Sequence, residues 1–156
     1  MRVTDVKTFI VHPGSGLYKK DWLFVKVETD EGIHGWGECY TQPDREQTIE
    51  SFVRAMARYL IGRDPFNIKH FTQVMYLDFV GKRGAMDFFS ALSGLEQAMW
   101  DIVGKATAQP VHRLLGGACR DRIRVYANGW AHGDDPPEVV AERALALVDR
   151  GFRAMK

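Results

Sequence analysis

Lys156 and a group of polar side chains near residue 130 are the residues of this sequence best suited to meet an anionic or hydroxylated ligand. Lys156 directly follows Phe152–Met155, a β-prone stretch, and Asn128, Trp130 and His132 follow an earlier one. A lysine can stabilise negative charge or, when its pKa is lowered, remove a proton. The other three side chains can hydrogen-bond a carboxylate or a polyol. Taken alone, the sequence favours a solvated lysine, and each of the three is as readily explained as a loop residue.

The elements around these residues predict two parallel strands joined by a helix. Ile123–Ala127 and Phe152–Met155 are the expected strands, and the helix is expected to begin at Asp135, as its cap, and to end before Gly151. Parallel neighbours require such a crossover, so this part predicts the opening of an α/β domain. Because domain boundaries normally fall in exposed linkers, we expect the natural polypeptide to continue past Lys156.

The first part of the chain predicts an antiparallel meander. Three β-prone stretches cover residues 3–11, 22–28 and 33–39, and Leu23, Val25 and Val27 alternate with polar residues in the second. Thr29–Gly32 is a hairpin turn, with glycine where a positive φ is expected. Short links between consecutive strands favour antiparallel pairing.

Helical spacing follows the meander. Asp44 and Gln47 form a capping box, and Asp64 precedes a proline at the start of a second helix. A third helix is expected over residues 85–107, and a short one over 110–115. Small residues on the third helix, Gly94 and Ala98 among them, allow a neighbouring element to approach closely.

Composition excludes several functional classes. Of 156 residues, 46% are hydrophobic and 26% charged, and the net charge is +1, which gives no reason to expect nucleic acid or an acidic membrane surface as a partner. We see no secretory signal and no run long enough to cross a bilayer. Cys39 and Cys119 form no disulfide framework; we interpret them as buried thiols in a cytoplasmic protein.

Several tempting residues are interpreted as structural. Glu96 and Asp101 lie five apart on one expected helix, so they do not share a face as a metal pair would; we interpret them as buried or interfacial polar anchors. Trp36 and Trp100 are interpreted as packing residues. The histidines have no zinc spacing, and no phosphate-binding or dinucleotide motif is present.

One stretch resembles a known family. Residues 91–105 read ALSGLEQAMWDIVGK and residues 110–116 read PVHRLLG, which resembles the signature helix of the mandelate racemase and muconate-lactonizing family of the enolase superfamily. Residues 31–38, 117–123 and 151–156 are similarly typical, so the resemblance covers essentially the whole chain. It points to the acid-sugar dehydratases of that family, similar to galactonate or gluconate dehydratases.

The resemblance implies an α+β capping domain, a three-stranded meander plus helices, over residues 1–118. It implies the first βαβ unit of a modified TIM barrel over residues 119–156, with the rest of the barrel absent. One Mg²⁺ ion would be held by carboxylates from later barrel strands, beyond Lys156, as would the usual histidine base.

The resemblance also implies roles for individual residues. Lys156 would be the first lysine of a Lys-x-Lys, Lys-x-His or Lys-x-Asn motif, stabilising substrate charge, with the role of base as a lesser possibility; His132 could only be an accessory acid. Cap loops at residues 13–21 and 40–44 would close over the substrate. The substrate-binding candidates are Tyr18, Lys19, Tyr40, Arg83, Asn128 and Trp130, with Lys20, Thr41 and Gln42 beside them. Exposed loop cations such as Lys19 and Arg83 are explained as well by simple solvation.

These observations lead to one preferred function and two alternatives. The preferred function is a Mg²⁺-dependent lyase that removes the proton next to a carboxylate and dehydrates an acid sugar to a 2-keto-3-deoxy acid. A racemase, epimerase or cycloisomerase would share the first half-reaction, and a non-catalytic binding or assembly module would follow if the chain ended at Lys156. By resemblance we also expect a homo-oligomer.

Overall fold

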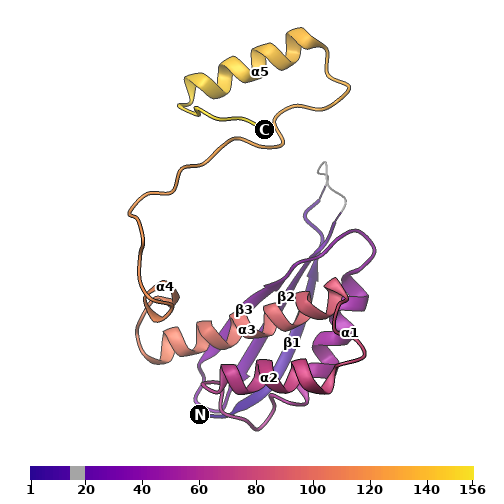
Figure 1. Cartoon of the computed structure of the whole chain (residues 1–156), viewed down its shortest axis with the longest axis vertical. Coiled ribbons are helices and arrows are strands. Elements are labelled where there is room, and N and C mark those ends of the chain that lie inside the picture. The colour runs from indigo at the N-terminus through magenta and orange to yellow at the C-terminus, as the bar shows by residue number, and fades with distance from the viewer. Residues whose placement is uncertain (15–19) are drawn as a thin grey trace. The chain divides into compact units, whose positions relative to one another are not determined.

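The computed structural model describes residues 1–14 and 20–156. The chain divides into two compact units, Met1–Gly117 and Ala118–Lys156 (Figure 1). Tyr18 and Lys19, two of the predicted substrate-binding residues, lie outside the described residues.

The first unit is built on a three-stranded sheet. Strands β1 (Val3–Val11), β2 (Trp22–Thr29) and β3 (His34–Cys39) pair antiparallel in the order β1-β2-β3, so the predicted meander is confirmed. The alternation of buried and polar residues predicted for β2 is confirmed. Leu23, Val25 and Val27 are completely buried, and the residues between them point to the other face of the sheet.

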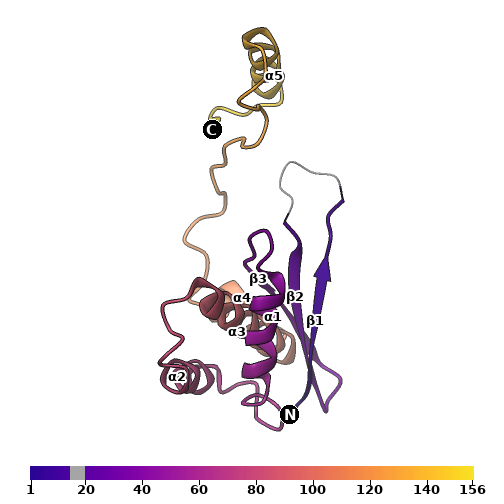
Figure 2. The ribbon, with the colours of Figure 1, turned by 90° about the vertical axis from the view of Figure 1, so that its right-hand side faces the viewer.

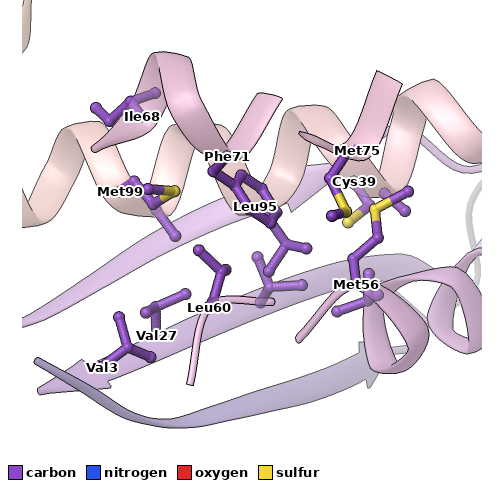
Figure 3. Close-up of a cluster of buried hydrophobic side chains, with 14 of the residues drawn as sticks. Val3, Val27, Cys39, Met56, Leu60, Ile68, Phe71, Met75, Leu95 and Met99 are labelled. Atoms are coloured by element: carbon purple, nitrogen blue, oxygen red, sulfur yellow. The ribbon is translucent and has the colours of Figure 1, made fainter. Parts of the chain in front are cut away.

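Helices cover one face of this sheet. Helices α1 (Glu46–Ala57), α2 (Ile68–Asp78) and α3 (Met86–Ala106) all lie on the same side of it (Figure 2), and the short α4 (Val111–Leu114) follows. The core lies between these helices and the sheet, where Met56 of α1, Phe71 of α2, and Leu95 and Met99 of α3 converge (Figure 3). The α+β cap predicted from the sequence is therefore confirmed.

Two helix starts differ from the prediction. Helix α1 begins at Glu46, so its N-cap position is Arg45, which makes no side-chain cap hydrogen bond; Asp44 lies one residue further from the helix, at a φ of 63°. Helix α2 begins at Ile68 rather than next to Asp64. The Asp64 carboxylate instead accepts a hydrogen bond from the Phe66 N–H, at 2.9 Å, and closes a turn ahead of the helix.

Helix α3 lies directly against strand β3 where glycines of the two elements face each other. A Cβ atom on Gly37 would lie 1.9 Å from the Gly94 carbonyl oxygen, and one on Gly35 would lie 1.9 Å from the Ala98 carbonyl oxygen. A Cβ on Gly94 would lie 2.4 Å from the Cys39 sulfur. The small residues of α3 therefore do allow the close approach expected from the sequence, and glycines on β3 complete it.

Side chains of α3 also bond the outer edge of β3. Asp101 Oδ2 accepts from the Trp36 N–H at 2.9 Å, and Lys105 donates to a β3 carbonyl at 2.8 Å. Gln97 accepts from the Glu38 N–H at 3.2 Å and donates to its carbonyl at 3.3 Å. Asp101 is thus a polar anchor, as predicted, and the edge strand is protected from pairing with another chain.

An ion network lies on the face of the sheet away from the helices. Glu28 accepts from Lys7 and from Lys26, each at 2.7 Å. Hydrogen bonds from Lys26 and Lys7, in that order, lower the pKa of the Glu28 carboxyl from 4.5 to about 2. The depressed pKa means that the folded state favours the charged form.

We expect Glu28→Gln to reduce the free energy of unfolding at neutral pH. The contribution of Glu28 is complete above its unfolded pKa near 4.5 and is lost as the pH falls through about 2. The difference between wild type and variant, measured by urea unfolding at several pH values, should therefore shrink over that window. Asp78→Asn, at an exposed carboxylate on α2, is the control; a constant wild-type difference down to pH 2 would contradict the assignment.

The second unit contains helix α5 (Pro137–Asp149) and a single parallel bridge between Ala127 and Met155. The parallel direction is as predicted, but the expected strands Ile123–Ala127 and Phe152–Met155 form no longer ladder. Ile123 and Val125 are 78% and 63% exposed. Parallel strands are stabilised by burial on both faces, and these side chains do not have it.

The two cysteines lie in different environments. Cys39 is buried, and burial raises the pKa of its thiol to about 12, whereas Cys119 is exposed, which corrects the prediction of two buried thiols. No helix in the described parts of the chain combines the length and apolarity that crossing a membrane requires.

Candidate functional site

Tyr40 and Lys20 form the centre of the candidate substrate-contacting surface of the first unit. Tyr40 follows β3 directly and is 53% exposed. The Lys20 ammonium lies 4.7 Å from the centroid of the Tyr40 ring and 5.6 Å from that of Trp22. The structure therefore brings a cation and a phenol together where the predicted cap loops meet, an arrangement that can bind a carboxylate beside a hydroxyl group.

Asp21 fixes the geometry of this surface. Its backbone N–H donates to Glu46 Oε1 at 3.2 Å, and its carbonyl accepts from the Thr41 hydroxyl at 2.5 Å. Thr41 is only 2% exposed, so its predicted contact with sugar hydroxyls is wrong. The hydroxyl is used to join the β3–α1 loop to the start of β2.

An imidazole–carboxylate pair beside this surface was missed by sequence reasoning. His12 Nδ1 lies 2.5 Å from Asp21 Oδ1, and the His12 side chain is largely exposed. The sequence held a signal for this pair. Val11, at the end of β1, pairs with Trp22, at the start of β2, and His12 and Asp21 are the residues immediately beyond these two strand ends. The carboxylate orients the imidazole so that its other nitrogen is available to a ligand.

Arg83 has a different environment from the one predicted for a substrate contact. Its guanidinium lies 4.2 Å from the centroid of the Tyr76 ring on α2, and the residue is half-buried. No contact recorded among residues 1–14 and 20–156 joins Arg83 to Tyr40 or Lys20.

Arg45 and Asp87 form an ion pair that sequence reasoning missed. Arg45 precedes α1 and donates to the Asp87 carboxylate in the first turn of α3, which raises the pKa of Arg45. Asp87 is 3% exposed, and its other oxygen has no partner among the described residues. The two residues lie 42 positions apart, so only the fold brings them together.

In the second unit, the structure places Asn128 and Lys156 next to the parallel bridge. The Lys156 N–H donates to the Ala127 carbonyl at 2.9 Å, and the Ala127 N–H donates to the Ala154 carbonyl at 3.0 Å. Asn128 and Lys156 therefore follow the carboxyl ends of neighbouring parallel segments, the edge at which α/β folds bind ligands. The Asn128 side chain accepts from the Gly129 N–H at 3.0 Å, which shapes its own loop.

Asp135 holds the loop that carries Trp130 and His132. It accepts from the His132 N–H at 2.7 Å and from Arg143 of α5 at 2.6 Å, so it is not the helix cap predicted from the sequence. The backbone hydrogen bond from His132, and then the charge of Arg143, lower the pKa of Asp135. Arg143 also donates to the Trp130 carbonyl at 3.4 Å. The loop that carries the half-buried Trp130 is therefore held in place by hydrogen bonds with Asp135 and Arg143.

The metal-ligating side chains of the described residues do not form a cluster. No group of three carboxylate, histidine or cysteine side chains among them is close enough to share an ion.

Comparisons with known proteins agree on one family. Residues 6–116 match the family model for the mandelate racemase/muconate lactonizing enzyme N-terminal domain. The chain is 41% identical over 156 residues to D-galactonate dehydratase of Verminephrobacter eiseniae and 44% identical over 157 residues to that of Pectobacterium atrosepticum. It is also similar to the solved structure of a mandelate racemase/muconate lactonizing enzyme from Sulfitobacter sp., with a TM-score of 0.85 and 34% identity over 99% of this chain.

The matched proteins are longer than this chain. The two dehydratases match over 100% of this chain, which covers 38% of each of them, and the Sulfitobacter protein matches over 99% of this chain, which covers 41% of it.

Proposed function

This chain belongs to the mandelate racemase/muconate lactonizing enzyme family, and on that premise we propose that the complete protein is an acid-sugar dehydratase acting on a galactonate-like acid. The observation that carries the proposal is the identity of 41% and 44% to two D-galactonate dehydratases over the whole of this chain. A galactonate-like substrate is proposed because both of these relatives carry the name D-galactonate dehydratase.

The proposed reaction removes water from the acid without changing its oxidation state overall. A base takes the proton from carbon 2, the hydroxyl of carbon 3 leaves with a proton as water, and the resulting enol becomes a 2-keto-3-deoxy acid. The difficult step is the first, because the proton next to a carboxylate is weakly acidic and the enolate concentrates charge on the carboxylate oxygens. The Mg²⁺ ion that the family implies would stabilise that charge. Its ligands would come from parts of the complete protein other than residues 1–156.

We propose that Lys156 supplies positive charge to the substrate carboxylate. Its backbone is fixed to Ala127 at the end of the parallel bridge, next to Asn128, and its side chain is exposed. Asn128 and Trp130 are proposed to contact the same substrate, because both follow Ala127, which is bridged to Met155 next to Lys156.

Tyr40 is proposed as the cap's substrate contact, with Lys20 as its charged neighbour. The exposed phenol can donate to a sugar hydroxyl, and the ammonium can attract the carboxylate. Tyr18 and Lys19 remain predictions of the sequence. Arg83 is a weaker candidate, since its stacking on Tyr76 already occupies one face of the guanidinium. A cytoplasmic homo-oligomer also remains a prediction.

The proposal is tested by incubating the complete protein and Mg²⁺ with a panel of sugar acids that includes D-galactonate, in D₂O. We expect a 2-keto-3-deoxy acid to form from galactonate, detected by its semicarbazone and by NMR. Deuterium incorporation at carbon 2 without a keto acid would instead identify a racemase or epimerase. Formation of no keto acid from any panel member would rule out the dehydratase.

A further inference from the structure

A cavity of about 510 Å³ opens in the first unit between the segment that follows α1 and helix α2. Its floor is apolar, because the core residues Leu60, Phe71 and Met99 line it, and their side chains converge beneath it (Figure 3). Sites for small molecules usually have volumes of about 300–1,000 Å³ and mostly apolar walls with a few polar groups. The cavity therefore has the size and the floor of a small-molecule site.

Three guanidinium groups line the rest of the cavity, those of Arg2, Arg58 and Arg63. Arg2 donates to the Gly62 carbonyl at 2.9 Å, and Arg58 donates to the Tyr59 hydroxyl at 3.3 Å. In the described part of the chain, no carboxylate forms an ion pair with any of the three. Each guanidinium has five N–H donors, so most of these donors remain open to an anionic ligand.

The first turn of α2 adds partial positive charge to the same cavity. Asn67, the N-cap residue of α2, lines the cavity, and the first turn of this helix contains no acidic residue. The start of a helix attracts anions through its N–H groups and its dipole. The Asp64 carboxylate also lines the cavity, but it accepts a hydrogen bond from the Phe66 N–H at 2.9 Å. Three guanidiniums outweigh this one carboxylate, so the cavity is cationic.

The cationic cavity and the candidate substrate-contacting surface lie at opposite ends of the sheet. Arg2 directly precedes β1, whereas Tyr40 directly follows β3, whose end pairs through β2 with the far end of β1. At about 3.3 Å per residue, β1 separates the two places by roughly 25 Å. A ligand in the cavity is therefore a different molecule from a substrate bound at Tyr40.

We propose that the cationic cavity binds a small phosphate monoester, with its phosphate held by Arg2, Arg58 and Arg63. A phosphate monoester carries about two negative charges near neutral pH, and the planar guanidinium fork matches its oxygens in pairs. Three guanidiniums suit this dianion better than a sugar acid, which has a single carboxylate. The inference does not depend on the dehydratase reaction proposed above.

Binding at this cavity would stabilise the first unit. The ligand would join Arg2, in the segment before β1, to Arg58 and Arg63, in the segment after α1. These groups come together only in the folded state, so the ligand shifts the folding equilibrium toward that state by mass action.

Inorganic phosphate is the probe for the first test, which is isothermal titration calorimetry of the complete protein without Mg²⁺ at constant ionic strength. We expect the wild type to bind phosphate and Arg63→Gln to weaken the affinity at least about tenfold, because a hydrogen bond to a charged group is lost. Arg113→Gln, which removes an exposed guanidinium from α4, is the matched control and should bind like the wild type. Lys156→Ala should also bind like the wild type, because it changes the proposed substrate site instead.

Protection from phenylglyoxal, a reagent for guanidinium groups, tests the cavity without any substitution. Phosphate should slow the modification of Arg2, Arg58 and Arg63 but not that of Arg113, measured for each residue by mass spectrometry of peptides. The proposal is overturned if the wild type does not bind phosphate, as would happen if another part of the complete protein filled the cavity. It is also overturned if Arg63→Gln keeps the wild-type affinity, if Lys156→Ala abolishes binding, or if phosphate protects none of the three arginines. Neither measurement reads turnover, so failure here leaves the dehydratase proposal standing.

Discussion

Turnover of D-galactonate by the complete protein should fall by about 100- to 1,000-fold when Lys156 is replaced by alanine, the cost typical of removing one donor that stabilises charge in a transition state. The lysine follows the parallel bridge between Ala127 and Met155, so its backbone position is fixed while its side chain is exposed. Steady-state kinetics at saturating Mg²⁺ gives kcat and KM for both proteins.

The control for this prediction is Lys69→Ala, which removes an exposed lysine from α2. Both variants should keep the wild-type melting temperature, because neither side chain is part of the core. Near-normal turnover by Lys156→Ala would remove Lys156 from the proposed site while leaving the dehydratase assignment open to the substrate panel.

Replacing Gly37 by alanine should destabilise the first unit by about 3 kcal/mol, the upper end of the usual cost of overpacking. The new Cβ would lie 1.9 Å from the Gly94 carbonyl oxygen, which belongs to the backbone of α3 and cannot rotate away. Either the helix lifts from β3 or the strand distorts, and both changes open the core. The measurement is urea unfolding of the complete chain followed by tryptophan fluorescence.

Gly81→Ala is the matched control for Gly37→Ala. A Cβ at Gly81 meets nothing within 4 Å, and its φ is not in the left-handed region, so this variant should be as stable as the wild type or slightly more so. Equal stability of the two variants would show that α3 does not lie as close to β3 as the structure describes.

The strands and helices of the first unit could be predicted because the apolar residues of each element recur at one regular spacing. The alternation of Leu23, Val25 and Val27 defines a half-buried strand, and the run of small residues around Gly94 defines where a neighbour lies. These are local consequences of geometry, so they can be read from one stretch of sequence.

Helix starts were less predictable, because an aspartate before a helix has more than one use. Asp64 closes a turn and Asp135 binds both the His132 N–H and Arg143, although each was predicted to cap a helix. The sequence does not reveal which N–H a short carboxylate will reach, since that depends on loop conformation.

The candidate site was predicted in part. Tyr40 is exposed, as a substrate contact requires, but the stacking of Arg83 on Tyr76 and the pairing of Arg45 with Asp87 depend on how the helices pack. Such contacts between distant residues follow from the tertiary structure, and no spacing in a single sequence encodes them.

The contrast between the two thiols gives this chain a natural attachment point for a probe. Thiolates are the reactive form, so Cys39, buried and with a pKa of about 12, will not react with a maleimide at neutral pH, whereas the exposed Cys119 will. Cys119 follows the first residue of the second unit, Ala118. Within residues 1–156, a thiol-reactive dye should therefore label Cys119, at the start of the second unit, and leave Cys39 unlabelled.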